Sequence, residues 1–343
     1  MKTDNHIDQD VIPLSSPLKW KKALEGINHA FGHTWESCYA MHLTTGSPTY
    51  LYTLKRGESR AVCPFAERSF NGYTDIYTPY GISGFAGEGD FPELQEYWNA
   101  FAAGRGYVCG YIGLNPIFEN PTYLNEKDIS CDNSLFILDL SLSLEHLYRN
   151  MQSGKRDEVR KAERNRYGYT TDKHLLKPFF LKNYAAYMKR KNATMAYSFT
   201  IKTLSYLINL DMTSMVGIIN NGKIEAATLN AYTPYIAEGY LFVSVPHCKN
   251  HTMALLWNGV KQLKAKNIPL FNLGGGIREN DSIAQYKRRL GGMEKKLKSL
   301  KQIYDPRLYD QLCNEACAPA TDTSGYFPPY RKPQLRRSTY AEA

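Results

Sequence analysis

The first half of the chain alternates between helical and strand-like patterns of apolar residues. Helical spacing runs over residues 18–31 and, after Pro92, over 93–103. Short runs of the strand type occur at 37–42, 49–54, 61–65, 75–80, 107–113 and 135–140. These patterns predict a mixed α/β unit whose sheet is partly antiparallel.

The second half repeats this plan without visible sequence repetition. A long helix is expected at 143–166, broken near Ser153–Gly154, and further helices at 178–191, 201–210 and 251–266. Strands are expected at 214–219, 223–232, 236–243, 269–273 and 295–304, with a type I′ turn at Asn221–Gly222. The prediction is therefore an α/β fold of two tandem units with mixed sheets.

The expected division of the chain has four parts. Residues 1–17 form an N-terminal tail, 18–142 the first unit, 143–305 the second unit, and 306–343 a terminal helix with a loose tail from about Ala318. A length of 343 residues suits two units. The two units are expected to face each other across a cleft.

Charge and cysteine content narrow the classes of protein. The formal net charge of +9 favours contact with phosphates, nucleic acid or anionic lipid, or serves solubility alone. Seven scattered cysteines without a Cys-x-x-Cys pair argue against a disulfide framework and against a zinc site. No apolar run approaches the roughly 18 residues of a membrane span, so the expected location is the cytoplasm.

The segment 271–292 carries the most functional information. It reads Phe-Asn-Leu-Gly-Gly-Gly-Ile-Arg-Glu-Asn-Asp-Ser-Ile-Ala-Gln-Tyr-Lys-Arg-Arg-Leu-Gly-Gly. Glycines 274–276 let the backbone approach a ligand, and a helix restarts at Ser282, which has capping-box spacing to Gln285. Asp281 adds a carboxylate near the positive end of that helix. The segment therefore predicts an anion-handling site, although a plain strand-turn-helix connection also accounts for the glycines.

This segment resembles the C-terminal part of the FemAB-like branch of the GNAT acyltransferase superfamily. That branch, which includes enzymes of peptidoglycan interpeptide bridges, usually has Asp-Leu-Gly-Gly, then Phe-Lys, then Gly-Gly. Asn272 and Tyr286 stand here where Asp and Phe are commoner. The resemblance implies two tandem GNAT-like domains over about residues 20–305 and an N-acyltransferase activity.

Two further motifs resemble the same family. In the basic stretch 155–166, Arg156 and Arg160 share one helical face at four-residue spacing. The resemblance implies that they meet phosphates at the domain junction; composition alone fits a solvated helix equally well. The Thr-Pro-Tyr-Gly turn at 78–81 implies that Tyr80 and Gly81 border the acceptor, although an ordinary turn has the same composition.

The donor site is less clear in the sequence. GNAT enzymes that use acyl-CoA hold its pyrophosphate on a glycine-rich loop at a helix start, and residues 248–254 occupy that place. Lys249 replaces the arginine, while Asn250 and Thr252 stand at glycine positions. The loop is degenerate, so the donor is either acyl-CoA or, as in some relatives, aminoacyl-tRNA.

The resemblance and the chemistry of acyl transfer together assign candidate roles. Lys287 is expected at the developing oxyanion or a phosphate, with Tyr286 beside it. Glu238, His247 and His251 are candidates to accept the amine proton. The residues expected to bind substrate are Arg156, Arg160, Tyr80, Gly81, Gly274, Gly275 and Arg278.

The expected reaction moves an acyl group from acyl-CoA to the amine of a sugar or peptide precursor of a cell-envelope polymer, without a metal. That acceptor is free, nucleotide-linked or lipid-linked, and in the last case the protein would sit at the inner face of the membrane. Three alternatives stay open at this point: transfer from aminoacyl-tRNA, a basic nucleic-acid-binding module, and a degenerate GNAT scaffold without activity.

Overall fold

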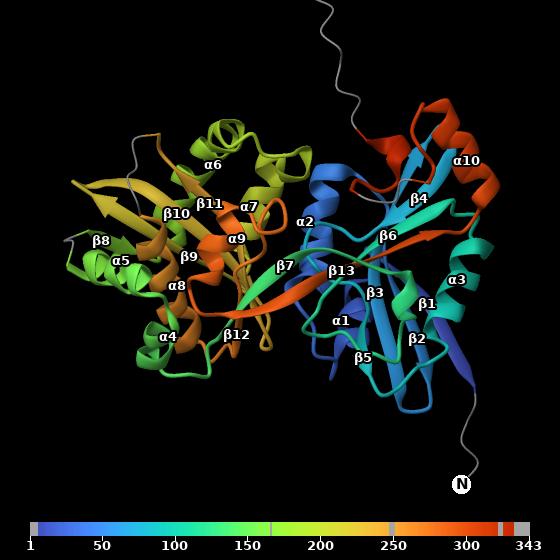
Figure 1. Cartoon of the computed structure of the whole chain (residues 1–343), viewed down its shortest axis with the longest axis horizontal. Helices are drawn as coiled ribbons and strands as arrows, with labels where there is room; N and C mark the ends of the chain where they lie inside the picture. Colours follow the sequence, from blue (N-terminus) through green and yellow to red (C-terminus); the bar gives the residue numbers. More distant parts are fainter. Residues whose placement is uncertain (1–5, 165–166, 247–250, 322–324, 333–343) are drawn as a thin grey trace, which may run out of the picture.

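The computed structural model describes residues 6–164, 167–246, 251–321 and 325–332, which form two lobes (Figure 1). One 13-stranded sheet runs through both lobes in the order β1-β2-β3-β4-β6-β13-β7-β12-β11-β10-β9-β8, with β5 paired to β3. The strands are β1 (Ile7–Pro13), β2 (Thr49–Arg56), β3 (Ser59–Phe70), β4 (Tyr73–Tyr77), β5 (Ala86–Glu88), β6 (Cys109–Leu114), β7 (Ile129–Asp139), β8 (Gly168–Thr170), β9 (Thr213–Asn220), β10 (Lys223–Tyr232), β11 (Ala237–Ser244), β12 (Leu270–Asn272) and β13 (Met293–Ile303).

The sheet confirms the mixed α/β class and the repeated plan. Each half contributes one parallel pair, β4 with β6 and β11 with β12, and the other pairs are antiparallel. The last strand of each half is exchanged, since β13 pairs with β6 of the first half and β7 pairs with β12 of the second. The two halves therefore share one sheet through β7 and β13, instead of facing each other as separately closed units.

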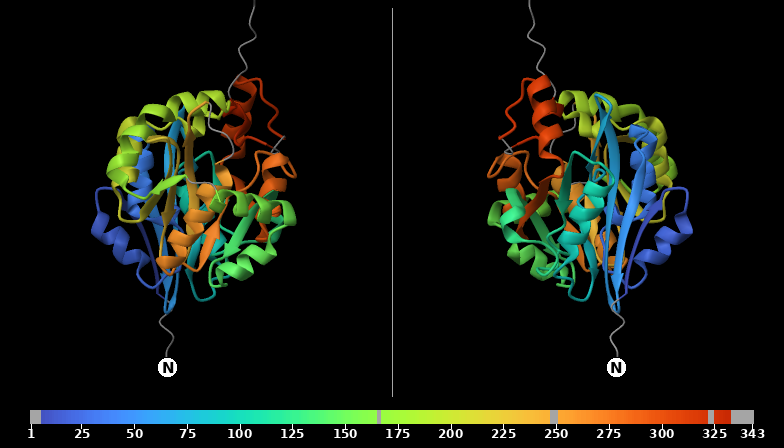
Figure 2. Two further views of the ribbon diagram at one scale, coloured as in Figure 1. Left: turned by 90° about the vertical axis from the view of Figure 1, so that its left-hand side faces the viewer. Right: turned by 90° about the vertical axis from the view of Figure 1, so that its right-hand side faces the viewer.

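Helices cover both faces of this sheet (Figures 1 and 2). The first lobe is packed around Trp20 and Trp98, and the second has cores on both sheet faces. The helices are α1 (Pro17–Leu24), α2 (Trp35–Thr45), α3 (Leu94–Gly104), α4 (Leu144–Asn150), α5 (Ser153–Arg164), α6 (Lys173–Arg190), α7 (Ile201–Asn209), α8 (Thr252–Ala265), α9 (Ser282–Arg288) and α10 (Pro306–Glu315). None of these helices has both the length and the apolar run that crossing a bilayer requires.

Local signals predicted several of these elements correctly. Asn221 and Gly222 both have positive φ, 48° and 73°, as the type I′ hairpin between β9 and β10 demands. The long helix expected from residue 143 is broken as predicted, into α4 and α5. These features depend on the turn and cap chemistry of a few neighbouring residues.

Two predictions in the first half were wrong. Residues 37–42 lie in helix α2, where Thr34 Oγ1 accepts from the Ser37 N–H (3.2 Å) and Gly46 ends the helix at φ 66°. Residues 7–13, expected in a tail, form edge strand β1 against β2. The tail prediction failed because an edge strand gains its hydrogen bonds from a partner far along the chain.

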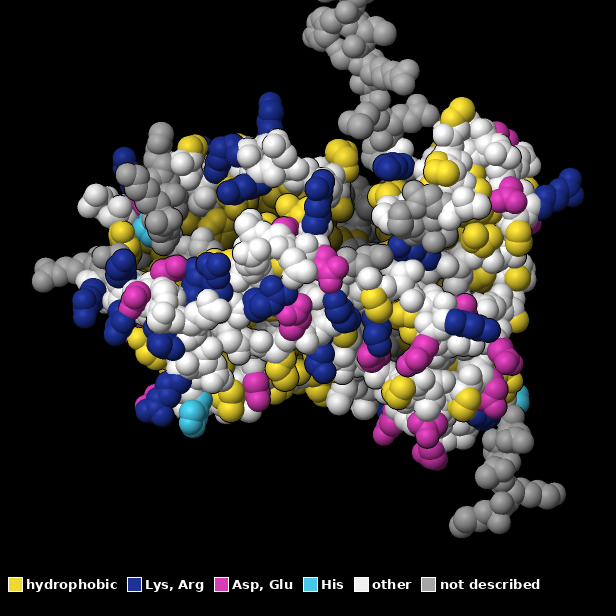
Figure 3. All heavy atoms as spheres, in the orientation of Figure 1, with side chains coloured by type: hydrophobic (Ala, Val, Ile, Leu, Met, Phe, Trp, Pro, Cys, Tyr) yellow, Lys and Arg dark blue, Asp and Glu magenta, His cyan; other side chains and the backbone are white. Residues whose placement is uncertain are grey.

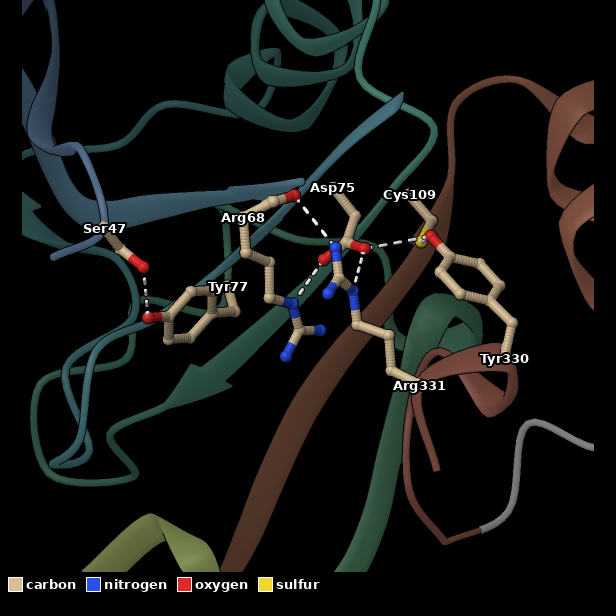
Figure 4. A network of polar contacts seen from close by, with 7 residues as sticks. All are labelled: Ser47, Arg68, Asp75, Tyr77, Cys109, Tyr330 and Arg331. Carbon is tan, nitrogen blue, oxygen red and sulfur yellow. Dashed lines mark hydrogen bonds and ion pairs between the residues drawn. The ribbon is translucent and has the colours of Figure 1, made fainter. Parts of the chain in front are cut away.

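The C-terminal segment is also more firmly held than its composition predicted. Phe327 and Tyr330 are buried, and the carboxylate of Asp75 on β4 accepts hydrogen bonds from Tyr330 (3.0 Å), Arg331 and Arg68 (Figure 4). Asp75 is only 1% exposed. Residues 325–332 therefore close over the first lobe through one buried carboxylate and two guanidinium groups.

Candidate active site

A cavity opens in the second lobe where the parallel strands β11 and β12 separate. They are paired only at Ala237↔Phe271 and Glu238↔Asn272, after which β12 ends and β11 continues to Ser244. The opening, about 230 Å³, is bordered by β10, β11, α8 and α9, and Figure 3 shows a hollow with hydrophobic side chains in this lobe. Its lining residues include Asn230, Gly239, Tyr240, Thr252, Phe271, Tyr286 and Lys287. Two divergent strands thus form a largely apolar slot with a few polar groups.

A β-bulge lies beside this slot. Leu229 pairs with Leu241 and Asn230 with Gly239, so Tyr240 is an extra residue without a partner in the ladder. A bulge leaves backbone groups unpaired and bends the strand. Strand β11 is therefore irregular on its β10 side, close to the point where its pairing with β12 ends.

The glycine-rich segment brings Lys287 to the end of the slot. Its ammonium donates a hydrogen bond to the carbonyl of Gly275 (2.7 Å). Gly274 has φ 74°, and a Cβ on Gly275 would lie 2.4 Å from the carbonyl oxygen of Ser134. A side chain at Gly275 would push the backbone away, so the glycine permits the close approach that fixes the acceptor of the Lys287 ammonium.

The departures from the family motif are chemically conservative. The Asn272 side-chain carbonyl accepts from the Gly274 N–H (2.8 Å), as an aspartate would. Helix α9 begins at Ser282 as predicted, but its cap is Asp281, which accepts from the Ala284 N–H (2.8 Å). The same carboxylate accepts from two N–H groups of the preceding loop, so it holds the glycine-rich turn and the helix together.

Lys287 is partly buried, not exposed on a basic helix face. Burial lowers the pKa of Lys287 from 10.5 to about 8, and the nearby Asp281 carboxylate partly opposes this change. The ammonium form still predominates at pH 7. Lys287 therefore supplies a positive charge in an apolar slot, where its field is poorly screened.

Tyr286 separates this slot from a second cavity of about 660 Å³. Its ring lies 3.9 Å from the ammonium of Lys155, and its hydroxyl is buried without a hydrogen-bond partner among the described residues. Burial, with the Glu158 carboxylate, raises the pKa of Tyr286 well above its usual range. Tyr286 therefore stays neutral and serves as a wall that both cavities share.

The basic helix α5 carries the two arginines that the sequence offered as phosphate contacts. Arg156 donates to the carbonyls of Met151 (2.5 Å) and Arg149 (3.3 Å), and Arg160 pairs with Asp157. Neither arginine is among the residues that border the second cavity. Both arginines are engaged with their own helical surroundings, and their contact with a phosphate stays a prediction.

Lys155 and Lys161 border that cavity instead, together with Thr252 at the start of α8. Lys155 is 8% exposed and its ammonium lies 2.6 Å from Glu158. Sequence reasoning missed Lys155, although it belongs to the basic run, because helical spacing fixes which residues share a face but not which face meets the neighbouring helix.

The donor position expected from the sequence falls at the start of α8. Thr252 is its first residue and borders both cavities, whereas Lys249, Asn250 and the candidate His247 lie outside the described residues. His251 is buried and its Nε2 is 2.8 Å from Glu225. The unsatisfied N–H groups of a helix start favour an anion there.

Glu238 lies one residue before the slot-lining Gly239. It is 7% exposed, and its Oε1 has no hydrogen-bond partner among the described residues. Burial raises its pKa from 4.5 to about 7, and its carboxylate in turn raises the pKa values of the already buried Tyr80 and Tyr240. An unpaired carboxyl group that titrates near neutrality is suited to exchange protons.

Tyr80 joins the two lobes beside Glu238. Its hydroxyl donates to the carbonyl of Tyr240 (3.4 Å), and its ring makes edge contacts with Tyr240, Tyr197 and Phe199 at 5.1–5.4 Å. Gly81 follows with φ 113°. The Thr-Pro-Tyr-Gly turn therefore packs against the second lobe on the Glu238 side.

Two further expectations concern ions. The side chain of Arg278 is exposed, with no hydrogen bond or ion pair recorded in the described part of the chain, and it does not border either cavity. Among the described residues, no three His, Cys, Asp or Glu side chains are grouped so as to hold a metal ion. Of the candidates, Lys287, Tyr286 and Thr252 border the slot, and Gly274 and Gly275 lie beside the Lys287 ammonium. Glu238 precedes the slot-lining Gly239 in the chain but borders neither cavity itself.

Comparison with known proteins identifies the fold. No family model and no curated protein matches the sequence. Among solved structures, FemX superimposes with a TM-score of 0.68 at 10% identity, covering 89% of this chain and 99% of that one. A conserved protein of unknown function from Bacteroides thetaiotaomicron gives 0.59 at 12% identity, covering 87% and 100%. L-PGS from Bacillus licheniformis gives 0.56 at 13% identity, covering 85% and 92%.

The chain therefore shares its overall fold with FemX and with these other solved structures. The resemblance drawn from the glycine-rich segment is confirmed at the level of fold. Identities of 10–13% establish the architecture and leave activity to be argued from the site itself.

Proposed function

We propose that the protein is an N-acyltransferase that moves an acyl group directly from donor to amine in the slot between β11 and β12. The supporting observation is the Lys287 ammonium, held by the Gly275 carbonyl at the end of an apolar slot. The amine nitrogen attacks the donor carbonyl carbon, the bond to the leaving sulfur or oxygen breaks, and negative charge develops on the carbonyl oxygen. Lys287 is positioned to stabilise that charge, because a fixed cation in an apolar site needs no reorganisation.

Glu238 is the proposed proton acceptor. An ammonium acceptor must lose one proton before attack and a second proton as the C–N bond forms. The carboxylate form of Glu238 is populated at neutral pH because its pKa is about 7. Its position beside Tyr80 supports entry of the acceptor from the interlobe side, with Tyr80 and Gly81 along its path.

Acyl-CoA is the proposed donor. The fit rests on the second cavity, where Lys155, Lys161 and the N-terminus of α8 at Thr252 offer positive charge and N–H groups to phosphates. Lys249 and Asn250, which precede this helix in the sequence, stay candidates for the phosphate on the sequence alone. Aminoacyl-tRNA, whose terminal nucleotide also carries phosphate, is the second candidate donor.

The proposed acceptor is an amino group on a sugar or peptide precursor of a cell-envelope polymer. The support for this acceptor is the resemblance of segment 271–292 to the FemAB-like branch, which includes enzymes of peptidoglycan interpeptide bridges. The proposed location is the cytoplasm, at the inner face of the membrane when the precursor is lipid-linked. The expected division into units at residues 142–143 stays a prediction.

A donor screen with one matched pair of variants tests this function. Purified protein is incubated with CoA thioesters or charged tRNA and with amino sugars or lysine-containing peptides, and acylated amine is quantified. Lys287→Met is expected to lower turnover about 10²- to 10³-fold. Arg289→Met removes an exposed charge two residues later and should leave turnover unchanged. Transfer from charged tRNA alone would show that aminoacyl-tRNA, not acyl-CoA, is the donor. Equal turnover in both variants would remove Lys287 from the mechanism.

A further inference from the structure

The segment between Asp172 and Asp211 contains no acidic residue. It forms α6, the short 3-10 helix Met195–Tyr197 and α7. Its cationic residues are Lys173, Lys177, Lys182, Lys189, Arg190, Lys191 and Lys202. A long run of one sign of charge, unbroken by carboxylates, produces a strongly positive local potential.

The end of this hairpin also exposes apolar side chains. We name residues 189–202 the α6–α7 tip. Met195 is 81% exposed and Ile201 67% exposed. Within the described chain, Lys189, Lys191 and Lys202 form no ion pair with a carboxylate. Figure 3 shows Lys and Arg side chains along the upper edge of the second lobe, where Figure 1 draws α6.

The inner side of the α6–α7 tip packs against the rest of the protein, and this packing holds the tip in place while its outer side stays exposed. The Tyr184 hydroxyl donates to the Tyr197 carbonyl (2.7 Å), and the rings of Tyr197 and Phe199 contact Tyr80. Thr44 of α2 and Thr203 of α7 share a hydrogen bond of 2.7 Å between the lobes. Met195 and Ile201 are thus exposed although the chain around them is anchored.

We infer that the α6–α7 tip binds the surface of an anionic membrane. Basic side chains attract acidic headgroups, and Met195 and Ile201 enter the boundary between headgroups and acyl chains. RNA would use the same cations but gives no environment that favours two exposed aliphatic side chains. The combination of uncompensated lysines with exposed aliphatic groups therefore favours a lipid surface over a nucleic acid.

This binding mode specifies how the acceptor arrives, and in that respect it rests on the proposed function. Tyr197 of the tip contacts Tyr80, which lies beside Glu238. A membrane held by the tip would lie next to the entrance on the acceptor side. The acceptor class that follows is an amine presented at the bilayer surface.

Vesicle flotation with two sets of variants tests the surface. Wild type is mixed with vesicles of phosphatidylcholine alone or of phosphatidylcholine with phosphatidylglycerol, and should float only with the second. Replacing Lys189, Lys191 and Lys202 by Gln should weaken binding roughly 100-fold, since each charge contributes about fivefold. The matched control replaces the exposed Lys19, Lys22 and Lys55 of the first lobe by Gln and should bind as wild type.

Variants of the two exposed aliphatic residues provide the decisive part of the vesicle experiment. Met195→Ser with Ile201→Ser keeps every charge and should weaken vesicle binding by at least about tenfold. Circular dichroism confirms that each variant is folded, and acylation of a soluble amine is expected to be unchanged. Failure of wild type to float, equal loss in the control set, or full binding by the serine pair would overturn the inference. Binding to RNA that depends on these charges, without binding to vesicles, would assign the tip to RNA instead. Acyl transfer is measured in a separate assay.

Discussion

Replacing Lys287 by Met should make the protein more stable while it impairs turnover. The desolvation that lowers the Lys287 pKa from 10.5 to about 8 corresponds to about 3 kcal/mol of unfavourable free energy in the charged form. Met has a similar length and no charge, and it leaves the Gly275 carbonyl without its donor, a loss of roughly 1 kcal/mol. Since Lys287 is only partly buried, we expect a net gain of about 1 to 2 kcal/mol near pH 7.

The pH dependence of this gain identifies its cause. Between pH 8 and 10.5 the folded wild type loses the Lys287 proton while the unfolded chain keeps it. The unfolded state then binds more protons, so wild-type stability rises with pH across this window. The advantage of the Met variant should therefore be largest below pH 8 and shrink as pH rises.

Urea unfolding of wild type and Lys287→Met near pH 7 and near pH 10 measures the difference between their free energies of unfolding. Other titrating groups contribute equally to both proteins and cancel in this difference. Arg289→Met serves as the control for removing an exposed charge from the same helix end. A variant that is less stable than wild type near pH 7, or a difference that does not change with pH, would refute the assignment of a buried, destabilising charge to Lys287.

Three further predictions concern separate parts of the molecule. Asp75→Asn should lower the free energy of unfolding by roughly 3 to 5 kcal/mol, because it leaves the guanidinium groups of Arg68 and Arg331 without a compensating charge. It should also speed proteolysis at the C-terminal segment, and an unchanged urea midpoint would contradict the prediction. Gly275→Ala should lower stability by about 1 to 3 kcal/mol and reduce turnover, because its Cβ would meet the Ser134 carbonyl; wild-type kinetics would show that the turn tolerates a side chain. Wild-type turnover should rise with pH through about 7 as Glu238 loses its proton, and Glu238→Gln should abolish that rise and lower turnover roughly 10²- to 10⁴-fold; the same ascending limb in the variant would assign it to another group.

Short-range signals were sufficient for much of the fold and for part of the site. The Asn221–Gly222 hairpin follows from two residues that tolerate positive φ, and the α4–α5 break lies close to Ser153–Gly154. The glycine-rich segment predicted that the backbone approaches a ligand; the structure shows the Gly275 carbonyl accepting from Lys287, and the ligand stays a prediction. In the hairpin and the helix break the physical cause lies within a few residues, so a sequence pattern can carry it.

Helix α2 was missed although its signals were local. Thr34, three residues before Ser37, and Gly46 at the far end are a cap and a stop of ordinary type. The apolar alternation at 37–42 favoured a strand because so short a run fits either period. A longer window that included both ends would have predicted the helix.

Contacts between distant segments decided the rest. Strand β1, the exchange of β7 and β13, and the closure of residues 325–332 on Asp75 each join parts of the chain that no local pattern connects. The choice of Lys155 over Arg156 at the second cavity is of the same kind. Composition and spacing define which residues share a strand or a helix face, whereas the pairing of strands and the packing of helices decide what each face meets. Burial of Lys287 and Glu238, and hence their altered pKa values, arises only from that packing.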